Sequence, residues 1–590
     1  MSIPSLDTLP VELIYYLLEY LDISTLLFSF RYVCKRFQTI VNSYDQYKLD
    51  MRLISKIDFD HICHVISPKK ILSIILTNDI DTPYQIRTFL SKFSFEQFSQ
   101  IQSLDLIKIE ENNLFSIVNH ISQCSLKSLS IDCKSWDKIS YTTRVLLSSL
   151  IAKFKLEKLN LNISYKGLDV FSWSPLPTTL KYLRLESCTF QEYCIILRHA
   201  INLHKFILTE CHMYDSNGTM YKPSDVIYQS KLKSLSFGAC YIRMKELSIL
   251  ISCTPTLNHM KLILWTDLSD PILNGKQWED FILKKLPLLN EFEFFFNILN
   301  YINRHSLVNI HLYIQPFQTP FWLEKKHWYV ACDYIKTLYI IRLYSLPICN
   351  SLLTYYTNSK KISCSTLSTT NNHVQLTDQV HELKFNLNET MEVNDNIQTN
   401  QLKDPIFQKI THLSLNVDGK HPYISLQSLQ TIIDLSSLVC LSMQILVHNL
   451  AQRSSLIDYI SSILKKTSNI HSLKIIYNHT GEPFINIEKL SSIIPRSIKH
   501  LQISITNLDE MKNILEQLNQ LSSVTFYSLN MSYYYEDIMK WIKVKQKNSI
   551  YRRGLRCIHI WLEISMNNNN NNGKNSMKKV FHRIRHKQIS

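Results

Sequence analysis

The sequence predicts an α/β fold in which a small helical unit at the N-terminus precedes a long series of strand–helix repeats. Three observations support this prediction. Apolar residues recur at helical spacing within the first 48 residues. From residue 101 onward, three apolar residues spaced i, i+3 and i+5 return mostly every 23 to 32 residues. Helical stripes fill the intervals, which is typical of parallel strands backed by an outer layer of helices.

The helical unit covers residues 1–48. Leu9, Leu13, Leu17 and Leu21 recur every four residues and so fall on one helical face. Asp22 is placed to cap a second helix, and a third apolar stripe follows it. A unit of about 45 residues rarely buries enough surface to hold itself together. Its surplus of apolar residues therefore predicts docking on a partner.

The order of residues in this unit resembles the F-box. The motif reads Leu9-Pro10-x-Glu12, then the leucines up to Leu21-Asp22, then Leu26-Leu27 and Val33-Cys34-Lys35-Arg36-Phe37. F-box domains bind the adaptor Skp1 and so join cullin-based ubiquitin ligases. The resemblance implies that the following residues contact the adaptor: Leu9, Pro10, Glu12, Leu13, Leu17, Leu21, Leu27, Val33, Cys34 and Phe37. Many family members have Trp where this chain has Phe37. The alternative is an ordinary three-helix cap on the next domain.

Residues 51–100 are expected to form a helical connector, and residues 101–345 the first half of the repeats. Helices are predicted over Thr143–Phe154 and Gln191–Ile201. The strand pattern begins at Ile101, Leu126, Leu156, Leu180, Leu203, Leu232, Leu257 and Leu289.

Three consecutive repeats carry a longer pattern, with Cys eight residues after the first apolar position. We expect the residues that define these repeats to form the core: Leu180, Leu183, Leu185, Cys188, Leu203, Phe206, Leu208, Cys211, Leu232, Leu235, Phe237 and Cys240. The spacing resembles the cysteine-containing leucine-rich repeat, which is common behind F-boxes. That resemblance implies an irregular solenoid with parallel strands on its concave face and helices on its convex face.

The second half repeats less regularly. Residues 346–408 are polar and rich in turn residues, and we interpret them as an irregular insertion before a second half over 409–566. The strand pattern there begins at Ile335, Val380, Ile410, Leu438, Ile470, Ile498, Leu521 and Leu555. A single continuous arc is the alternative to two halves.

The net charge of +15 is concentrated at the C-terminus. Residues 540–590 hold thirteen Lys and Arg residues and one acid, Glu563, so the preceding body is nearly neutral. Residues 567–590 begin with six Asn residues and are expected to form a disordered basic tail. Such a tail binds anions, serves as a nuclear-import signal or only keeps the protein in solution.

The composition sets limits on other functions. No run of 18 apolar residues and no secretory signal occurs, so we expect a cytoplasmic or nuclear protein with reduced cysteines and no membrane partner. Eight isolated glycines offer no phosphate-binding loop, and no metalloprotease, hydrolase or Cys-x-x-Cys motif appears. We expect no cofactor and no metal. The cluster His61-Ile62-Cys63-His64 is the nearest to a set of metal ligands, and we do not expect it to bind a metal ion. The aromatic residues Trp265, Phe294–Phe296, Trp322 and Trp328 are better explained as core than as a ligand site.

These observations together predict a non-catalytic substrate-recognition subunit of an SCF-type ubiquitin ligase. The F-box would bind Skp1 and through it a cullin, and the repeats would hold a target protein whose identity the sequence leaves open. One alternative is an interaction scaffold that takes no part in ubiquitination. The other, less favoured because the body is nearly neutral, is nucleic-acid binding through the basic C-terminus.

Overall fold

The computed structural model describes residues 6–121, 124–133, 140–163, 176–213, 231–299, 308–356, 361–367, 376–386, 405–418, 426–446, 453–477, 487–545 and 548–563. The expected tail at 567–590 lies outside these ranges. Helices alternate with parallel strands behind a helical N-terminal unit, so the predicted α/β class is confirmed. None of the helices described combines the length and the apolar character that crossing a membrane requires.

The N-terminal unit consists of short helices and one strand. Pro10 precedes the first helix, where a missing amide hydrogen costs little. The Asp22 carboxylate accepts a 2.8 Å hydrogen bond from the Thr25 amide and so caps the second helix, as its position in the sequence predicted. The elements are η1 (Leu6–Thr8), α1 (Val11–Leu18), α2 (Ile23–Phe28), η2 (Phe30–Tyr32), α3 (Lys35–Ser43) and β1 (Tyr47–Asp50).

Residues 51–100 contain a strand as well as helices, which differs from the helical connector that we expected. Ile71, Ile74 and Leu76 carry the same apolar pattern as the later repeats, and all three are buried. The strand that they form pairs in parallel with β1 on one side and β3 on the other. The sheet therefore begins well before residue 101. The elements are α4 (Lys56–Val65), β2 (Ile71–Thr77) and α5 (Gln85–Lys92).

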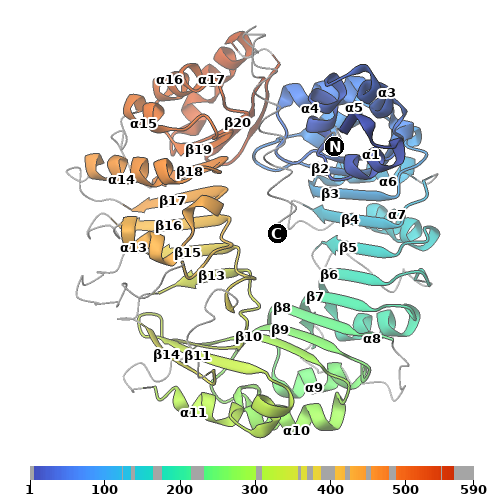
Figure 1. Ribbon diagram of the computed structural model, residues 1–590, viewed down its shortest axis with the longest axis vertical. Helices are drawn as coiled ribbons and strands as arrows, with labels where there is room; N and C mark the ends of the chain where they lie inside the picture. The colour runs from blue at the N-terminus through green and yellow to red at the C-terminus, as the bar shows by residue number, and fades with distance from the viewer. Residues whose placement is uncertain are drawn as a thin grey trace.

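The first sheet continues as one parallel series from β1 to β10 (Figure 1). Each strand begins two residues after the apolar position at which the pattern placed a repeat. The strands are β3 (Ser103–Ile109), β4 (Ser128–Cys133), β5 (Lys158–Asn162), β6 (Tyr182–Thr189), β7 (Lys205–His212), β8 (Ser234–Tyr241), β9 (His259–Thr266) and β10 (Glu291–Leu299). The helices between them are α6 (Glu111–His120), α7 (Tyr141–Lys153), α8 (Phe190–His199), α9 (Met244–Ser252) and α10 (Gly275–Lys285).

The residues that define the cysteine-containing repeats lie in the core. Leu183 aligns with Phe206, and Cys188 aligns with Cys211 on the next strand. All twelve of these residues are 5% exposed or less. Burial raises the pKa of Cys188 well above its ordinary value, so the thiol fills space without reacting. The assignment of the repeats to the leucine-rich type stays a prediction.

The first sheet ends in antiparallel strands. β12 pairs with β10, and β11 then pairs with both β12 and β14. The start that we placed at Ile335 is wrong, because Ile335, Leu338 and Ile340 fit the apolar spacing but span the turn of the β11–β12 hairpin. The elements are α11 (His311–Ile314), β11 (Tyr329–Ile335), β12 (Ile340–Leu346) and β14 (Lys361–Ser365).

A second sheet of nine strands follows, so the strands form two sheets and two apolar cores. The expected insertion at 346–408 contains β13, β14 and β15, because its strands keep alternating apolar residues despite a polar composition. The strands are β13 (Leu352–Tyr355), β15 (Glu382–Asn386), β16 (His412–Asp418), β17 (Cys440–Leu446), β18 (Ser472–Tyr477), β19 (His500–Ser504), β20 (Ser523–Tyr527), β21 (Ile550–Arg553) and β22 (Cys557–Trp561). The helices are α13 (Leu426–Ile432), α14 (Arg453–Lys466), α15 (Ile487–Ile493), α16 (Leu508–Gln517) and α17 (Met531–Lys545).

The start placed at Leu555 is also wrong. Leu555 is 97% exposed and lies in the turn between the antiparallel strands β21 and β22. The intervals that precede Ile335, Val380 and Leu555 are longer than all the other intervals between repeats. The interval before Val380 coincides with the passage from the first sheet to the second.

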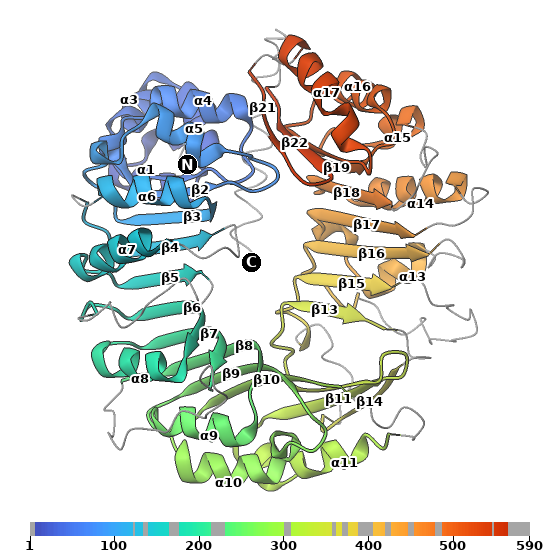
Figure 2. The ribbon, with the colours of Figure 1, turned by 180° about the vertical axis from the view of Figure 1, so that it is seen from behind.

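The two sheets run in opposite directions along the molecule, so the last strands return to the first helices (Figures 1 and 2). Helices cover the outer side of each sheet in both views. The last strand, β22, is joined to the segment that follows β1 by a hydrogen bond from Trp561 to Ile54 and by the packing of Trp561 against Phe59.

Candidate functional site

Helix α1 of the N-terminal unit has a buried row and an exposed row of apolar side chains. Ile14 and Leu18 are fully buried, whereas Leu13 is 48% exposed. Tyr16 on α1 and Tyr20 in the turn just after it follow Leu13 at helical spacing and are 66% and 81% exposed. Exposed apolar rows of this kind are typical of protein–protein interaction sites.

A second exposed apolar pair follows helix α2. Tyr32 is 69% exposed and Val33 is 40% exposed. Sequence reasoning missed Tyr16, Tyr20 and Tyr32, although Tyr16 and Tyr20 continue the helical row of Leu13. The tyrosine hydroxyl tolerates water, so such residues stay exposed until a partner covers their rings.

The structure divides the ten residues expected to contact the adaptor. Pro10, Glu12, Leu13 and Val33 are exposed, and Leu9, Leu17, Leu21 and Cys34 are half-buried. Leu27 and Phe37, two of the residues expected to contact the adaptor, are only 3% and 2% exposed and so offer a partner almost no surface in this structure. Phe37 instead stacks on Phe30 inside the unit, with 4.5 Å between ring centroids. Both residues hold the helices that carry the exposed positions.

Hydrogen bonds fix the turn that contains Leu9 and Pro10. The Arg36 guanidinium donates a 2.6 Å hydrogen bond to the Leu9 carbonyl oxygen, which ties this turn to α3. The Tyr15 hydroxyl lies 2.9 Å from the Ser43 hydroxyl and joins α1 to the other end of α3. The N-terminal turn is therefore held in place before any partner binds.

The N-terminal unit is continuous with the first sheet. The Tyr47 hydroxyl, at the start of β1, donates a 2.5 Å hydrogen bond to the Val41 carbonyl in α3. Burial, the largest cause, raises the pKa of Tyr47 to about 12. Phe28 packs against His61 of α4, with 5.3 Å between ring centroids. A partner bound to α1 is thus held in a defined orientation relative to the sheet.

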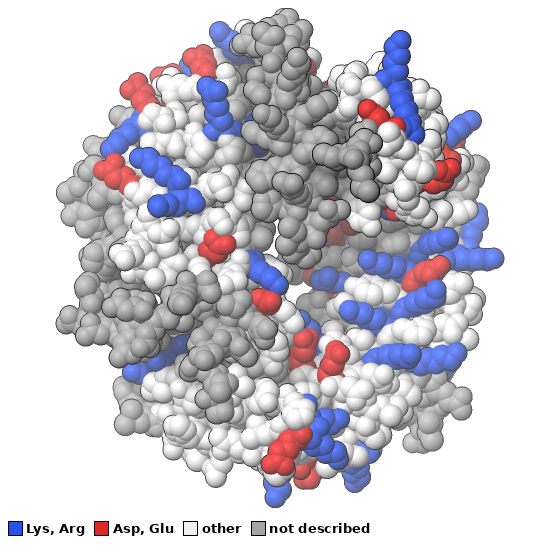
Figure 3. Space-filling model, viewed as in Figure 1, with Lys and Arg blue, Asp and Glu red and all other residues white. Residues whose placement is uncertain are grey.

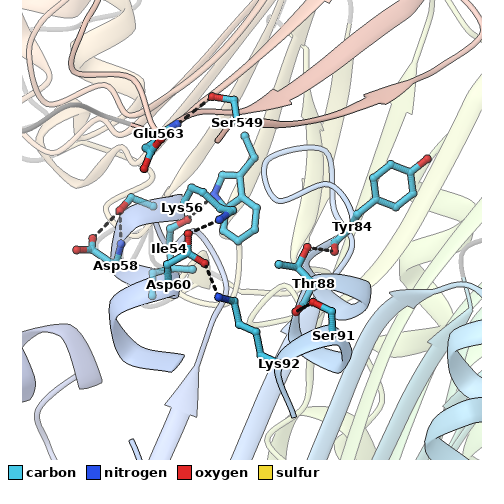
Figure 4. Close-up of polar contacts among 12 residues, drawn as sticks. Ile54, Lys56, Asp58, Asp60, Tyr84, Thr88, Ser91, Lys92, Ser549 and Glu563 are labelled. Carbon is cyan, nitrogen blue, oxygen red and sulfur yellow. Dashed lines mark hydrogen bonds and ion pairs between the residues drawn. The ribbon is translucent and has the colours of Figure 1, made fainter. Parts of the chain in front are cut away.

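The junction of the chain ends brings charged residues together (Figure 4). The Asp60 carboxylate in α4 forms ion pairs with Lys56 of the same helix and with Lys92 of α5, whose Nζ lies 3.2 Å from the carboxylate oxygen. Close by, the Glu563 amide donates a 3.1 Å hydrogen bond to the Ser549 hydroxyl. A pocket of about 510 Å³ lies in the same region, and its walls include Asp22, Asp50, Arg52, Lys499 and Ser522. Helix α2 and the second sheet therefore share one polar surface.

The junction also assembles Ser523, His500 and Asp81, a combination that resembles a catalytic triad by composition only. The Ser523 hydroxyl donates to Asp81 at 3.0 Å, and His500 Nδ1 lies 2.9 Å from the same hydroxyl. The serine proton is thus directed to the carboxylate and not to the imidazole, which is the reverse of nucleophile activation. All three side chains are largely buried, and burial raises the pKa of Asp81 and lowers that of His500.

A cysteine and a histidine also meet on β22, where Cys557 Sγ lies 3.3 Å from His559 Nε2. Burial raises the pKa of Cys557, which favours the thiol over the nucleophilic thiolate. The imidazole is further held by the Thr525 hydroxyl, 2.9 Å from Nδ1. This pair therefore stabilises the hairpin.

The remaining sequence candidates can be placed as well. Phe294, Phe296 and Trp322 are fully buried, and Trp265 and Trp328 are half-buried, so these aromatic residues mostly fill the core. Over the described part of the chain, no three His, Cys, Asp or Glu residues are grouped as a metal ion would require, and this includes His61, Cys63 and His64.

Comparison with known proteins identifies the N-terminal unit. No curated protein is significantly similar to the chain. A family model, the F-box domain, matches residues 6–49, which are the helices described above together with nearly all of β1. An F-box domain implies binding to Skp1 and through it to a cullin. Residues 6–49 of this chain therefore match the F-box domain family.

Proposed function

We propose that this protein is the substrate-recognition subunit of an SCF-type ubiquitin ligase. The observation that carries the proposal is the exposed apolar row on α1, which lies inside the F-box match. F-box proteins are typically non-catalytic adaptors, and the role needs no chemistry from this chain.

In this proposal, the adaptor covers the exposed and half-buried positions of the F-box. Its contacts are Leu9, Pro10, Glu12, Leu13, Leu17, Leu21, Val33 and Cys34, together with Tyr16 and Tyr20. Leu27 and Phe37 support these contacts from inside the domain. Burying a few such side chains contributes about 1.5–3 kcal/mol each, which suffices for a stable complex.

The two sheets form the body that holds the target protein, and we assign them to irregular leucine-rich repeats. Helices cover the outer side of each sheet, so the inner face of the parallel strands presents many side chains to a partner. The target is then held near the ligase's catalytic partner, so transfer is accelerated by effective concentration. The direct continuation of α3 into β1 would keep that distance defined.

The test is adaptor binding by a variant with one change on the exposed row of α1 and one in the exposed pair that follows α2. Leu13→Asp/Val33→Asp places two charges where the adaptor would sit, and neither residue is in the core. We expect the affinity for purified Skp1, measured by calorimetry, to fall by at least about 30-fold, because a hot-spot residue contributes about 2 kcal/mol or more. Val544→Asp/Leu555→Asp is the matched control, since these residues are 69% and 97% exposed far from the F-box in sequence.

Equal binding by the two variants would overturn the docking assignment. The role in ubiquitination has its own test, which is recovery of the full-length protein from cells after proteasome inhibition. Recovery with both Skp1 and a cullin is expected, together with proteins that accumulate ubiquitin. Recovery with Skp1 but never with a cullin would favour the scaffold instead.

A further inference from the structure

A row of lysines crosses the first sheet at the N-terminal ends of β4 to β8. Each member lies one or two residues after the first apolar position of its repeat, so the repeat itself places them side by side. We call this set the lysine row: Lys127, Lys158, Lys181, Lys205 and Lys233. All five are exposed, and Lys155, Lys231 and Arg184 add exposed positive charge beside them. Figure 3 shows blue side chains gathered over this half of the molecule.

Strand register sets the spacing of the row. Lys158 aligns with Tyr182, which aligns with Lys205 on the next strand. Neighbouring strands lie about 4.8 Å apart, so Lys158 and Lys205 are about 10 Å apart at their backbones and the whole row spans about 19 Å. The Lys158 ammonium lies 5.2 Å from the centroid of the Tyr182 ring, which orients it along the surface.

Little negative charge opposes the row. Among the residues that the structure describes, the row forms one ion pair, between Lys181 and Glu157 at 2.8 Å, and the same carboxylate also attracts Lys127. The positive surface stops at β9, where His259 and Lys261 both approach Glu293. Like charges held this close repel one another, and an anionic ligand relieves that repulsion.

The same strands carry acidic residues toward their C-terminal ends. Asp132 and Glu186 lie there on β4 and β6, and Glu210 lies on β7. Burial raises the pKa of Asp132 and of Glu186, and neighbouring carboxylates raise both further. The exposed strand face is therefore positive along one edge and negative along the other, which confines an anionic ligand to the lysine row.

We propose that the lysine row binds an extended segment rich in Asp and Glu from the target protein. The segment would lie across the strands, where about six residues at about 3.3 Å each match the 19 Å span. Separate lysine ammonium groups suit carboxylates distributed along a chain, whereas phosphate recognition favours the bidentate fork of Arg. That the segment belongs to a ubiquitination target rests on the proposed function; that the row binds acidic peptide does not.

The test compares two full-length variants that each lose three positive charges. Lys158→Gln/Lys205→Gln/Lys233→Gln removes three of the five lysines of the row. Lys276→Gln/Lys284→Gln/Lys285→Gln is the control on exposed positions of α10. The probe is a fluorescein-labelled peptide of eight glutamates, followed by anisotropy at low salt, with a glutamine octapeptide as the uncharged comparison. The basic C-terminal residues are present in both variants, so their contribution cancels.

We expect the row variant to bind the glutamate peptide about tenfold more weakly than the control variant, because each removed ammonium group loses an exposed ion pair with the peptide. Equal weakening in both variants would overturn the proposal. Tighter row-dependent binding of a phosphoserine peptide or of oligothymidylate would assign the row to phosphate or to nucleic acid instead. Both variants should bind Skp1 as tightly as the wild type does. If none of the three proteins binds Skp1, the proposed function is wrong, whereas the peptide result still decides the proposal for the lysine row.

Discussion

The indole nitrogen of Trp561 donates a 3.0 Å hydrogen bond to the carbonyl oxygen of Ile54, a residue 507 positions earlier in the chain. The indole is fully buried, and its edge meets the ring of Phe59 with 5.1 Å between centroids. Arg552 adds a 2.8 Å hydrogen bond to the Asn78 carbonyl. The strand that ends the described chain is thus packed on the segment that follows the F-box.

Trp561→Ala should open this junction. Loss of a fully buried indole costs about 3–5 kcal/mol, and most of it should appear locally because the rest of each sheet keeps its own core. Hydrogen exchange read by mass spectrometry should therefore accelerate in both α4 and β22. Trp561→Phe is the control, since it keeps an aromatic ring, although a smaller one, and lacks the donor; it should cost less stability than Trp561→Ala. Unchanged exchange in α4 would show that the two ends do not stabilise each other.

Asp81→Asn should stabilise the protein more as the pH rises. Burial raises the folded-state pKa of Asp81 above its ordinary value of 3.8, and this outweighs the lowering by His500 and Ser523. Stability from this group is therefore complete below the unfolded-state pKa and is lost as the pH rises through the folded-state pKa. Asn still accepts the Ser523 hydrogen bond but carries no buried charge.

The measurement is the thermal midpoint of both proteins between pH 4 and pH 8. The thermal midpoint of the variant should rise relative to that of the wild type as the pH increases across that interval. His500 is present in both proteins, so its own titration affects both curves. A difference in midpoint that is the same at every pH would contradict the assigned direction of the Asp81 shift.

Leu27→Ala and Leu13→Ala should weaken adaptor binding for different reasons. Leu27 is buried, so its truncation should cost about 2–5 kcal/mol of F-box stability. Leu13 is half-exposed, and its truncation should cost no more than about 1 kcal/mol of stability while still removing one of the proposed adaptor contacts. Guanidinium unfolding, followed by far-UV circular dichroism, measures the stability of each variant and so distinguishes loss of F-box stability from loss of an adaptor contact. A large stability loss in Leu13→Ala would place this residue in the core instead.

Cysteine labelling should follow burial. Cys188 and Cys240 are buried and their pKa values are raised mainly by desolvation, so iodoacetamide at pH 8.5 should leave both unmodified in the native protein. Cys34 is half-exposed and should be modified under the same conditions. Peptide mass spectrometry gives the extent at each position, and denatured protein should be labelled at all three. Native labelling of Cys188 at the rate of Cys34 would contradict its place in the core.

Local pattern predicted most of the strands. Every start from Ile101 to Leu289 and from Val380 to Leu521 precedes a strand by two residues, because an inward apolar triplet is a property of the repeat itself. The same triplet at Ile71 would have predicted β2. The starts at Ile335 and Leu555 failed because hairpins bring apolar residues to the same spacing with antiparallel pairing, and pairing direction has no local signature.

The sequence by itself determined the F-box, its adaptor class and the strand–helix alternation, since each depends on residues within about forty positions of one another. Only the tertiary structure decided which row of α1 stays exposed, because Ile14 and Leu18 compete with Leu13 and Leu17 for the same core. It also decided that Trp561 reaches Ile54 and that Asp81 reaches Ser523. Contacts between such distant residues arise from the summed curvature of two sheets, which no short segment encodes.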